Sequence, residues 1–203
     1  MKSSLLAAAV ASTLLLAGAM PAQAAQNDIL VRARALNIQP DVSTSGTLST
    51  IHTDVGPQTV PELDFTYMVM DHVGVELILG TARHKVTSDL GTLGRISHLP
   101  PTLTLQYHFN PTGKIRPYAG VGVNYTRFYD NDLHVGDTPV SVKKNSFGPA
   151  LQIGVDVALN ERWFLNADVK KLWIKTDASM DGQSLGTLKI NPWLIGVGIG
   201  YRF

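Results

Sequence analysis

The sequence predicts an eight-stranded antiparallel β-barrel that spans an outer membrane, with short periplasmic turns and longer extracellular loops. Three observations lead to this prediction. Apolar and polar residues alternate with a period of two in eight segments after residue 24. The connections between these segments are alternately short and long. One face of the segments is almost continuously aliphatic and aromatic, whereas the other mixes charged side chains, amides, glycine and methionine.

The first 24 residues have the pattern of an export signal. Lys2 provides a positive start, an apolar run extends over residues 5–20, and residues 22–24 match the small-x-small rule for cleavage. A membrane-anchoring helix is the alternative, but small and polar residues interrupt the run, whereas a spanning helix needs about 20 predominantly apolar residues. We therefore predict a cleaved signal peptide over residues 1–24 and an outer-membrane barrel over residues 25–203.

The composition excludes several classes of function. Removal of Lys2 with the signal lowers the 17 basic side chains to 16, equal to the 16 acidic ones, so no basic surface for a nucleic acid is expected. The chain has no cysteine, which excludes disulfides and thiolate metal sites and fits an oxidising compartment. The six histidines include no pair two or four residues apart, so we expect neither a metal nor another cofactor.

The eight alternating segments and their connections set the topology. Short turns are predicted at 71–72, 110–114 and 160–161, and long polar loops at 41–60, 85–97, 129–145 and 178–187. With eight strands, both chain ends lie on the side of the short turns, which is the periplasmic side of an outer-membrane barrel. The first long loop either caps the barrel or is mobile. The predicted strands are 29–40, 63–70, 73–80, 98–109, 116–126, 151–158, 162–177 and 193–203.

A soluble antiparallel barrel also alternates with a period of two, but it would have charges outside and apolar side chains inside. An aliphatic outer face is favourable only when the barrel is surrounded by lipid. A Lys or Arg that faces the bilayer midplane costs about 2–4 kcal/mol. Aromatic residues near the strand ends match the two interfacial girdles of such barrels. These are Tyr67, Tyr107, Phe109, Tyr125, Trp163, Trp173, Trp193, Tyr201 and Phe203.

Chain direction sorts the inward residues by depth. The periplasmic half is expected to hold Arg32, Arg34, Glu76, His108, Arg116, Asp156, Asn166, Asp168 and Arg202, and the outer half Leu36, Ile38, Ile78, Phe128, Leu172, Ile174 and Leu194. Asp64 in the outer half, and Met68 and Met70 in the periplasmic half, are exceptions to this sorting.

The interior of an eight-stranded barrel is about wide enough for side chains or one slim ligand. Buried charges must be paired, so we expect the inward-facing charged side chains to pair with one another and to plug the lumen. A purely structural network is the alternative. The apolar outer half predicts a funnel that draws in a hydrophobic ligand. The predicted plug comprises Arg32, Arg34, Arg116, Asp156, Asp168 and Arg202.

Pro100 and Pro101 stand near the outer end of the fourth predicted strand. Each proline removes a ladder donor, so this strand should part from its neighbour and leave a lateral gap in the wall. The alternative is a proline pair that only starts the strand beneath a loop.

The sequence offers no catalytic constellation. Ser97 and His98 are adjacent and point to opposite faces of a strand, so they cannot form a nucleophile–base pair. His98 and Glu76 could meet inside the barrel, but a structural hydrogen bond is the simpler interpretation. We predict that the protein is not an enzyme, with a lipid-modifying outer-membrane enzyme as a less favoured alternative because it needs a Ser, a His and an acid on one face.

The mature chain contains the stretches Phe65–Met68, Val73–Leu77, His98–Leu103, Arg116–Gly122, Asn124–Thr126, Asn191–Trp193 and Gly200–Phe203. Together they resemble the OmpW family of small outer-membrane proteins over essentially all of the mature chain. The resemblance implies a monomeric eight-stranded barrel with a hydrophobic lumen, uptake of small hydrophobic or amphipathic molecules, and lateral release at the strand with the proline pair. The terminal Phe203 is similar to the assembly signal of many outer-membrane proteins.

Two positions bear on the lumen of such a channel. Ile78 matches an apolar channel-lining position of the family. Lys170 departs from it, because some relatives carry a bulky aromatic residue there. The cation pairs either with Asp168 or Asp156, or it favours ligands with an acidic head group.

The prediction is thus a passive outer-membrane channel for small hydrophobic or amphipathic molecules, with release into the bilayer near Pro100 and Pro101. A structural or surface-recognition barrel that acts through its extracellular loops is the alternative. The expected partners are outer-membrane lipids, the hydrophobic solute and, through Phe203, the barrel-assembly machinery, with no nucleic acid. The predicted channel-lining residues are Leu36, Ile38, Glu76, Ile78, Phe128, Lys170, Leu172 and Leu194.

Overall fold

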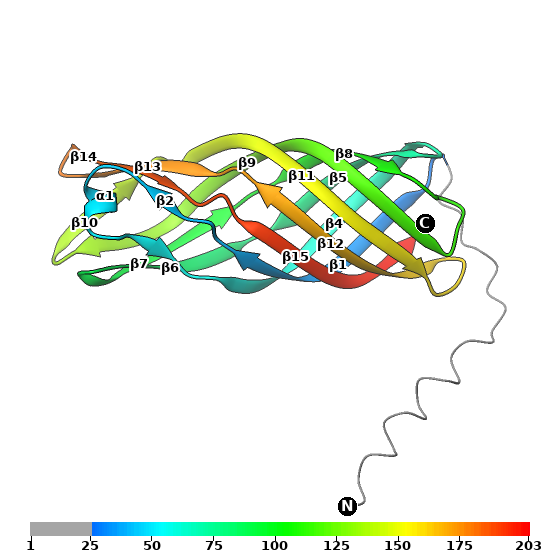
Figure 1. Cartoon of the computed structure of the whole chain (residues 1–203), viewed down its shortest axis with the longest axis horizontal. Coiled ribbons are helices and arrows are strands. Elements are labelled where there is room, and N and C mark those ends of the chain that lie inside the picture. Colours follow the sequence, from blue (N-terminus) through cyan, green and yellow to red (C-terminus); the bar gives the residue numbers. More distant parts are fainter. Residues whose placement is uncertain (1–25) are drawn as a thin grey trace, which may run out of the picture.

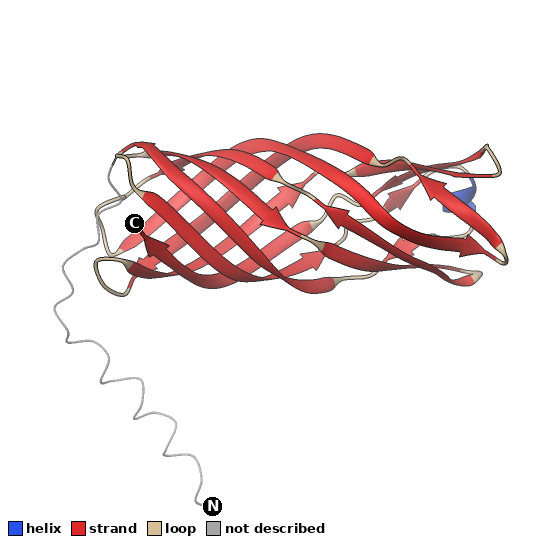
Figure 2. Ribbon diagram, turned by 180° about the vertical axis from the view of Figure 1, so that it is seen from behind, coloured by secondary structure: helices blue, strands red, loops and turns tan. Residues whose placement is uncertain are grey.

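The computed structural model describes residues 26–203, which form a closed antiparallel β-barrel of eight wall strands (Figures 1 and 2). This confirms the predicted fold class. The predicted signal peptide lies outside the described residues. None of the helices within residues 26–203 is long and apolar enough to cross a membrane.

Short breaks divide several wall strands in two, so that β5 continues as β6, β7 as β8, β10 as β11, β12 as β13 and β14 as β15. A single turn of helix, α1 (Thr47–Thr50), lies between the first two long strands. The strands are β1 (Ile29–Gln39), β2 (Ser43–Thr44), β3 (Asp54–Val55), β4 (Gln58–Met70), β5 (Val73–Gly80), β6 (Ala82–Ser88), β7 (Gly91–Leu99), β8 (Thr102–His108), β9 (Ile115–Val135), β10 (Thr138–Val142), β11 (Asn145–Ala158), β12 (Trp163–Leu172), β13 (Lys175–Met180), β14 (Gln183–Lys189) and β15 (Trp193–Arg202).

The barrel closes between the first and last strands. Strand β1 pairs with β15 on one side and with β4 on the other, so that Arg34 lies between Gly198 and Glu62. Closure leaves no open sheet edge, which is the condition for a β-structure to span hydrocarbon. It also brings residues from distant parts of the chain to one level of the lumen.

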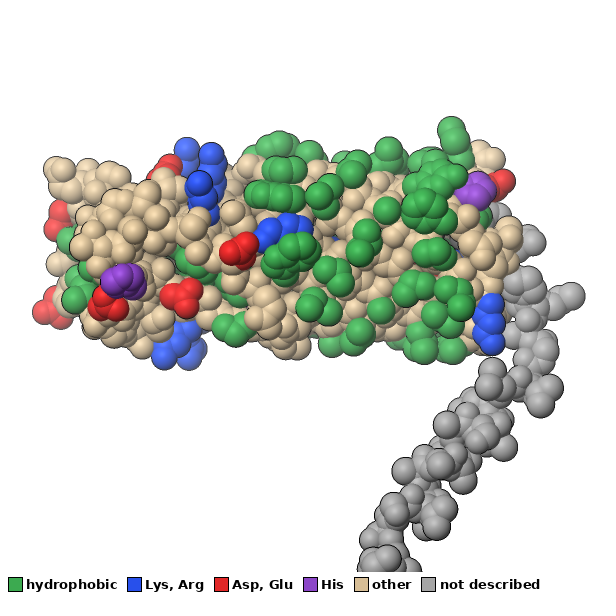
Figure 3. Space-filling view, in the orientation of Figure 1, with side chains coloured by type: hydrophobic (Ala, Val, Ile, Leu, Met, Phe, Trp, Pro, Cys, Tyr) green, Lys and Arg blue, Asp and Glu red, His purple; other side chains and the backbone are tan. Residues whose placement is uncertain are grey.

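The period-two pattern sets which face of each strand is buried. Along β1 the even-numbered residues are buried and the odd-numbered ones are more exposed. The outward residues of the wall are large and apolar, for example Leu103, Val121 and Ile195. Figure 3 shows these hydrophobic side chains over the part of the barrel near the chain ends, with most charged side chains of this view toward the outer hairpins. The band of apolar side chains is the lipid-facing belt.

The strands extend further outward than the sequence predicts. Strand β9 alone has 21 residues, about 70 Å at the usual rise per residue, whereas about 9–11 residues cross a membrane. Most of three predicted loops therefore belongs to the hairpins β6–β7, β9–β10 and β13–β14. The pattern search missed these parts because their outer face meets water and carries no aliphatic stripe.

One local feature differs from the predicted pattern, and a second forms a tight outer turn. Met70 does not point into the lumen as predicted: a bulge at Met68 and Met70 turns it outward, where it is 62% exposed, while Met68 stays buried. In the tight hairpin between β13 and β14, Asp181 and Gly182 both have positive φ, as a type I′ turn requires.

Candidate functional site

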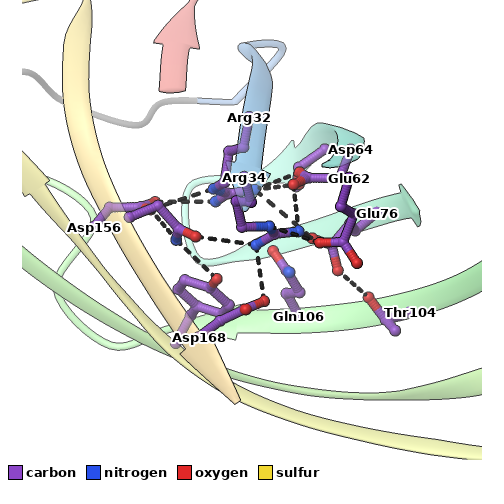
Figure 4. A network of polar contacts seen from close by, with 12 residues as sticks. Arg32, Arg34, Glu62, Asp64, Glu76, Thr104, Gln106, Asp156 and Asp168 are labelled. Carbon is purple, nitrogen blue, oxygen red and sulfur yellow. Dashed lines mark hydrogen bonds and ion pairs between the residues drawn. The ribbon is translucent and has the colours of Figure 1, made fainter. Parts of the chain in front are cut away.

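The periplasmic half of the lumen contains a network of charged side chains centred on Arg32 and Arg34 (Figure 4). Arg32 donates from Nη1 to Asp64 Oδ1 at 3.0 Å and from Nη2 to Asp156 Oδ2 at 2.9 Å. Arg34 donates from Nε to Glu62 Oε1 at 2.7 Å, and its guanidinium also pairs with Asp64. The β1–β4 register places Arg32 opposite Asp64 and Arg34 opposite Glu62, so the pleat itself forms two of these pairs.

Closure of the barrel adds partners from β12, which is separated from β1 by β15. Arg34 Nη1 donates to Asp168 Oδ2 at 2.8 Å. Lys170 Nζ lies 2.6 Å from Asp168 Oδ2 and 2.9 Å from Glu62 Oε1. Of the two partners predicted for Lys170, Asp168 is therefore present and Asp156 is not. The ammonium is nearly fully buried between two carboxylates.

Neutral polar side chains fill the gaps between the charges. Glu76 Oε2 accepts a hydrogen bond from Thr104 at 2.8 Å. Gln152 donates to Asp168 at 3.0 Å and accepts from Gln106 at 3.1 Å. The network thus crosses the lumen from β1 and β4 to β8, β11 and β12. Buried charges are stable only when paired and hydrogen-bonded, and the side chains of this network meet that condition by pairing with one another across the lumen.

Aromatic rings close the level beneath the network. The guanidinium of Arg116 lies over the ring of Phe164, with its carbon 4.9 Å from the ring centroid. A Cβ at Gly200 would lie 2.2 Å from Phe164, so the missing side chain is what lets the ring fit. Arg202, predicted as part of the plug, lies apart from it: its guanidinium is half-buried and pairs with Asp28 at 3.5 Å.

Above the charges lies an apolar chamber. Its walls include Leu36, Ile38, Ile78, Leu172 and Leu194, and Glu62 and Lys170 are its polar lining residues on the side of the network. The cavity measures about 20 Å³, which is room for about one water molecule. The outer half of the lumen is therefore a packed core and not the open funnel that the sequence predicts.

The outer opening is covered by the segment between β1 and β4. Leu48 on α1 is only 4% exposed and belongs to the apolar cluster that includes Leu36 and Leu194. Asp89 N donates to Ile51 O at 2.9 Å and links this segment to the β6–β7 hairpin. Of the two alternatives for the first loop, the structure has the cap. The physical reason is the burial of an apolar side chain that would otherwise face water.

The wall is interrupted beside the chamber. The β5–β8 pairing ends at Ile78 and Thr102, and the β6–β7 pairing begins only at Ala82 and His98. Between them lie Gly80 and Thr81 on one strand and Pro100 and Pro101 on the other. The strands part here because a proline has no N–H to donate.

The interruption affects only the side of β7–β8 that faces β5–β6, and side chains close it. Pro101 O still accepts from Tyr125 N at 3.0 Å, so the pairing toward β9 continues. Across the gap, the hydroxyl of Thr81 bonds to the hydroxyl of Tyr129 and to His98 O at 3.3 Å. Gly80, Thr81 and Pro100 line the chamber, whereas Pro101 does not.

Other predicted lumen residues occupy distinct places. Phe128 belongs to the outer apolar cluster but does not line the chamber. Its ring packs against His98, which stacks on His84 with centroids 5.0 Å apart. His98 does not meet Glu76, which bonds to Thr104 in the charged network. Among residues 26–203, no group of three or more His, Asp or Glu is arranged to hold a metal ion.

Sequence reasoning missed two members of the network. Asp64 is not in the outer half but at the level of Arg32. The predicted second strand begins at Leu63, one residue too late to include Glu62. The signal that could have found Glu62 is its alternation with Asp64 on the same face of β4.

The closed barrel, its lipid-facing belt and its sealed lumen define a small outer-membrane β-barrel protein. The sequence profile described as the OmpW family matches residues 25–203, and the chain belongs to this family. This confirms the resemblance and the location in the outer membrane.

Individual relatives agree with the family assignment. The chain is 39% identical to outer membrane protein W of Salmonella typhi over 97% of both chains. It is 31% identical, over 74% of both chains, to a Pseudomonas aeruginosa protein named dibenzothiophene metabolism operon protein PahQ. Among solved structures, the outer membrane protein OprG from Pseudomonas aeruginosa matches with a TM-score of 0.81 and 31% identity, covering 90% of this chain and 99% of that one.

Proposed function

We propose that the protein is a passive channel that takes small hydrophobic or amphipathic molecules from outside into the bilayer. The observation that carries the proposal is an apolar chamber that is sealed by charges below and touches an interruption in the barrel wall. A solute that reaches the chamber cannot cross the charged network, because apolar surface gains nothing there. The gap between β5–β6 and β7–β8 is the remaining way out.

The narrow chamber makes the channel a gated one. With room for about one water molecule, the chamber accepts a solute only when its side chains and the α1 cap move. The Thr81–Tyr129 hydrogen bond closes the lateral gap at rest and must open for release. A relative named for a dibenzothiophene metabolism operon supports an apolar solute, since dibenzothiophene is a small planar arene.

A reversible lock across the gap tests this route. The chain has no cysteine, so Leu79→Cys with Pro101→Cys introduces a single pair. Continuing the register from Leu77 and Leu103 places these two positions opposite each other on the lipid-facing side of the gap. We expect oxidation to slow accumulation of labelled dibenzothiophene at least several-fold, and reduction to restore it.

The matched control is Val75→Cys with Leu105→Cys, which lies on the same face of the regular β5–β8 ladder. Its oxidation should leave uptake unchanged. Equal uptake by the oxidised and reduced gap pair, with the disulfide shown by electrophoresis, contradicts lateral release.

The second candidate is a structural or surface-recognition barrel. The packed outer half and the α1 cap favour it, because neither feature requires a solute. A panel of apolar and amphipathic compounds separates the two functions. If cells with and without the protein accumulate every compound equally, the channel proposal fails and the structural function stands.

A further inference from the structure

Three lysines at the outer end of the barrel form a positive surface, here called the lysine patch: Lys143 directly after β10, Lys175 on β13 and Lys189 on β14. Strands β10, β13 and β14 lie side by side, and Lys175 is directly opposite Lys189 in the β13–β14 register. Lys143 N donates to Asp177 O at 2.9 Å, which places the first lysine on the other side of β13. All three side chains are exposed on the outside of the barrel.

The lysine patch has too few acidic partners. Asp177 is the one carboxylate that lines the same hollow, and its Oδ1 accepts a hydrogen bond from Thr187 at 2.8 Å. Within residues 26–203, none of the three ammonium groups forms an ion pair with a carboxylate. Like charges directly opposite each other on a sheet are unfavourable. The arrangement is therefore poised to take an anion from outside the protein.

The opposite side of the barrel mouth shows the contrasting arrangement. There Arg83 pairs with Asp130 at 3.3 Å, and Arg95 lies opposite Asp132 in the β7–β9 register. Lys85 lies opposite Arg95 on its other side, so this side of the mouth also has a like-charged pair, but Asp130 and Asp132 on β9 lie beside its cations. The β10–β13–β14 side differs because Asp177 is the one carboxylate that lines the hollow shared by its three lysines.

The level of the lysine patch relative to the membrane indicates what kind of anion reaches it. Lys143 and Lys175 also line a second hollow, together with Tyr125 and Phe147. Phe147 is 67% exposed and points away from the barrel, and Tyr125 lies opposite it on β9. Exposed aromatic side chains mark the level of the lipid head groups. The lysines stand just outside this girdle, where phosphates of the outer leaflet lie.

We propose that the lysine patch binds the phosphate groups of a phosphorylated glycolipid in the outer leaflet. The ammonium groups contact the phosphates as point charges. Hydroxyl groups of Ser43, Thr44 and Ser45 line the same hollow and offer further donors. Phe147 below contacts the acyl chains. This site lies on the outside of the wall and does not depend on the transport function of the lumen.

The test uses the purified full barrel in detergent and native mass spectrometry with bisphosphorylated lipid A as the probe. The variant is Lys143→Gln, Lys175→Gln and Lys189→Gln. We expect it to bind at least about tenfold more weakly than the unaltered protein, since each basic residue near an anionic surface contributes about 1 kcal/mol. Dephosphorylated lipid A should bind both proteins equally weakly.

The matched control removes the same charge elsewhere: Lys85→Gln, Arg95→Gln and Lys114→Gln. Lys85 and Arg95 are a like-charged cross-strand pair on the β6–β7 hairpin, and Lys114 is in a periplasmic turn. This variant should bind as tightly as the unaltered protein. Equal weakening by both variants means that only net charge matters and overturns the proposal.

Two further outcomes also overturn the proposal that the lysine patch binds a phosphorylated glycolipid. The first is equal affinity of the lysine patch variant and the unaltered protein, with folding of both confirmed by heat-dependent migration in electrophoresis. The second is complete displacement of lipid A by inorganic phosphate at matched concentration, because the lysine patch would then be a site for free phosphate. Binding that is lost only in the lysine patch variant and resists inorganic phosphate supports a lipid site.

Discussion

The periplasmic half of the lumen is held by directed contacts between Arg32, Arg34 and their carboxylates, whereas the outer half is held by close packing of aliphatic side chains. Directed ion pairs tolerate no missing partner, because each loss leaves a buried charge unpaired. Aliphatic packing has no directional requirement and can rearrange around a guest at a smaller cost. The periplasmic half is therefore the rigid part of the lumen, and the outer half is the part that can rearrange.

The largest effect is expected in the periplasmic half. Arg34→Met removes the cation that contacts Glu62, Asp64 and Asp168. The carboxylates left behind should lower the free energy of unfolding by about 3–5 kcal/mol. Urea unfolding of the refolded barrel in lipid vesicles measures this loss.

The control for this substitution is Arg83→Gln, which removes an exposed arginine that pairs with Asp130. It should change the free energy of unfolding by no more than about 1 kcal/mol. A loss of similar size in the two variants would mean that the buried network is no more important than a surface ion pair.

A smaller loss of stability, with a gain of function, is expected in the outer half. Leu172→Ala enlarges the chamber, and such truncations cost about 2–5 kcal/mol in well-packed cores. Because the chamber then has room for a guest, uptake of dibenzothiophene should rise. Uptake that stays constant while the barrel remains folded would argue against passage through this chamber.

The interruption in the wall can be repaired without touching either half. Pro100→Thr with Pro101→Val restores two N–H donors, the one at position 100 toward Gly80 across the gap and the one at position 101 toward Tyr125 on β9, so the ladder can extend across the gap. Uptake should fall several-fold while the free energy of unfolding stays equal or rises slightly. Retained uptake together with restored amide protection at both positions would remove the lateral gap from the mechanism.

The smallest expected effect concerns the cap over the outer half. A hydrogen bond from the exposed His52 Nδ1 to Asp89 at 2.6 Å raises the pKa of the imidazole. A raised folded-state pKa means that the contact is fully present below the unfolded value of about 6.5 and is lost as pH rises through the folded value. Protection of the Asp89 amide, which bonds to Ile51 O, should therefore be greater at pH 5.5 than at pH 8.

Amide exchange of Asp89, corrected for the intrinsic rate at each pH, measures this change. The matched variant is His52→Asn, which keeps a polar side chain but removes the titrating group. It should show equal protection at both pH values. If the unaltered protein does the same, the His52–Asp89 contact does not hold the cap.

Much of the wall could be predicted from sequence, because a period of two directly states which side chains share a face. Residues such as Arg32, Arg34 and Leu36 point inward as their alternation predicts. The outer ends of the strands could not be predicted in this way. Beyond the bilayer, both faces of β9 or β13 are partly polar or small, so the contrast on which the search relied disappears.

The charged network was predictable in composition but not in its contacts. Pairs between neighbouring strands, such as Arg34 with Glu62, follow from the register of one hairpin. The contact between Arg32 and Asp156 joins residues 124 positions apart and depends on the diameter and stagger of the closed barrel. The partners of Lys170 also depend on closure. The sequence allows either an ion pair with an aspartate or a contact with an acidic ligand, and the closed barrel places Glu62 beside the ammonium group.

The strand pattern, the lipid-facing belt, the inward direction of the arginines and the wall break at Pro100 and Pro101 all follow from the order of residues along the chain. These are local properties of alternating side chains and of a ring without an N–H. In contrast, the packing of the outer half of the lumen beneath Leu48 and the carboxylates that neutralise each cation follow from the closed barrel. Both depend on how far apart the walls stand after closure, a distance that no stretch of the chain encodes alone.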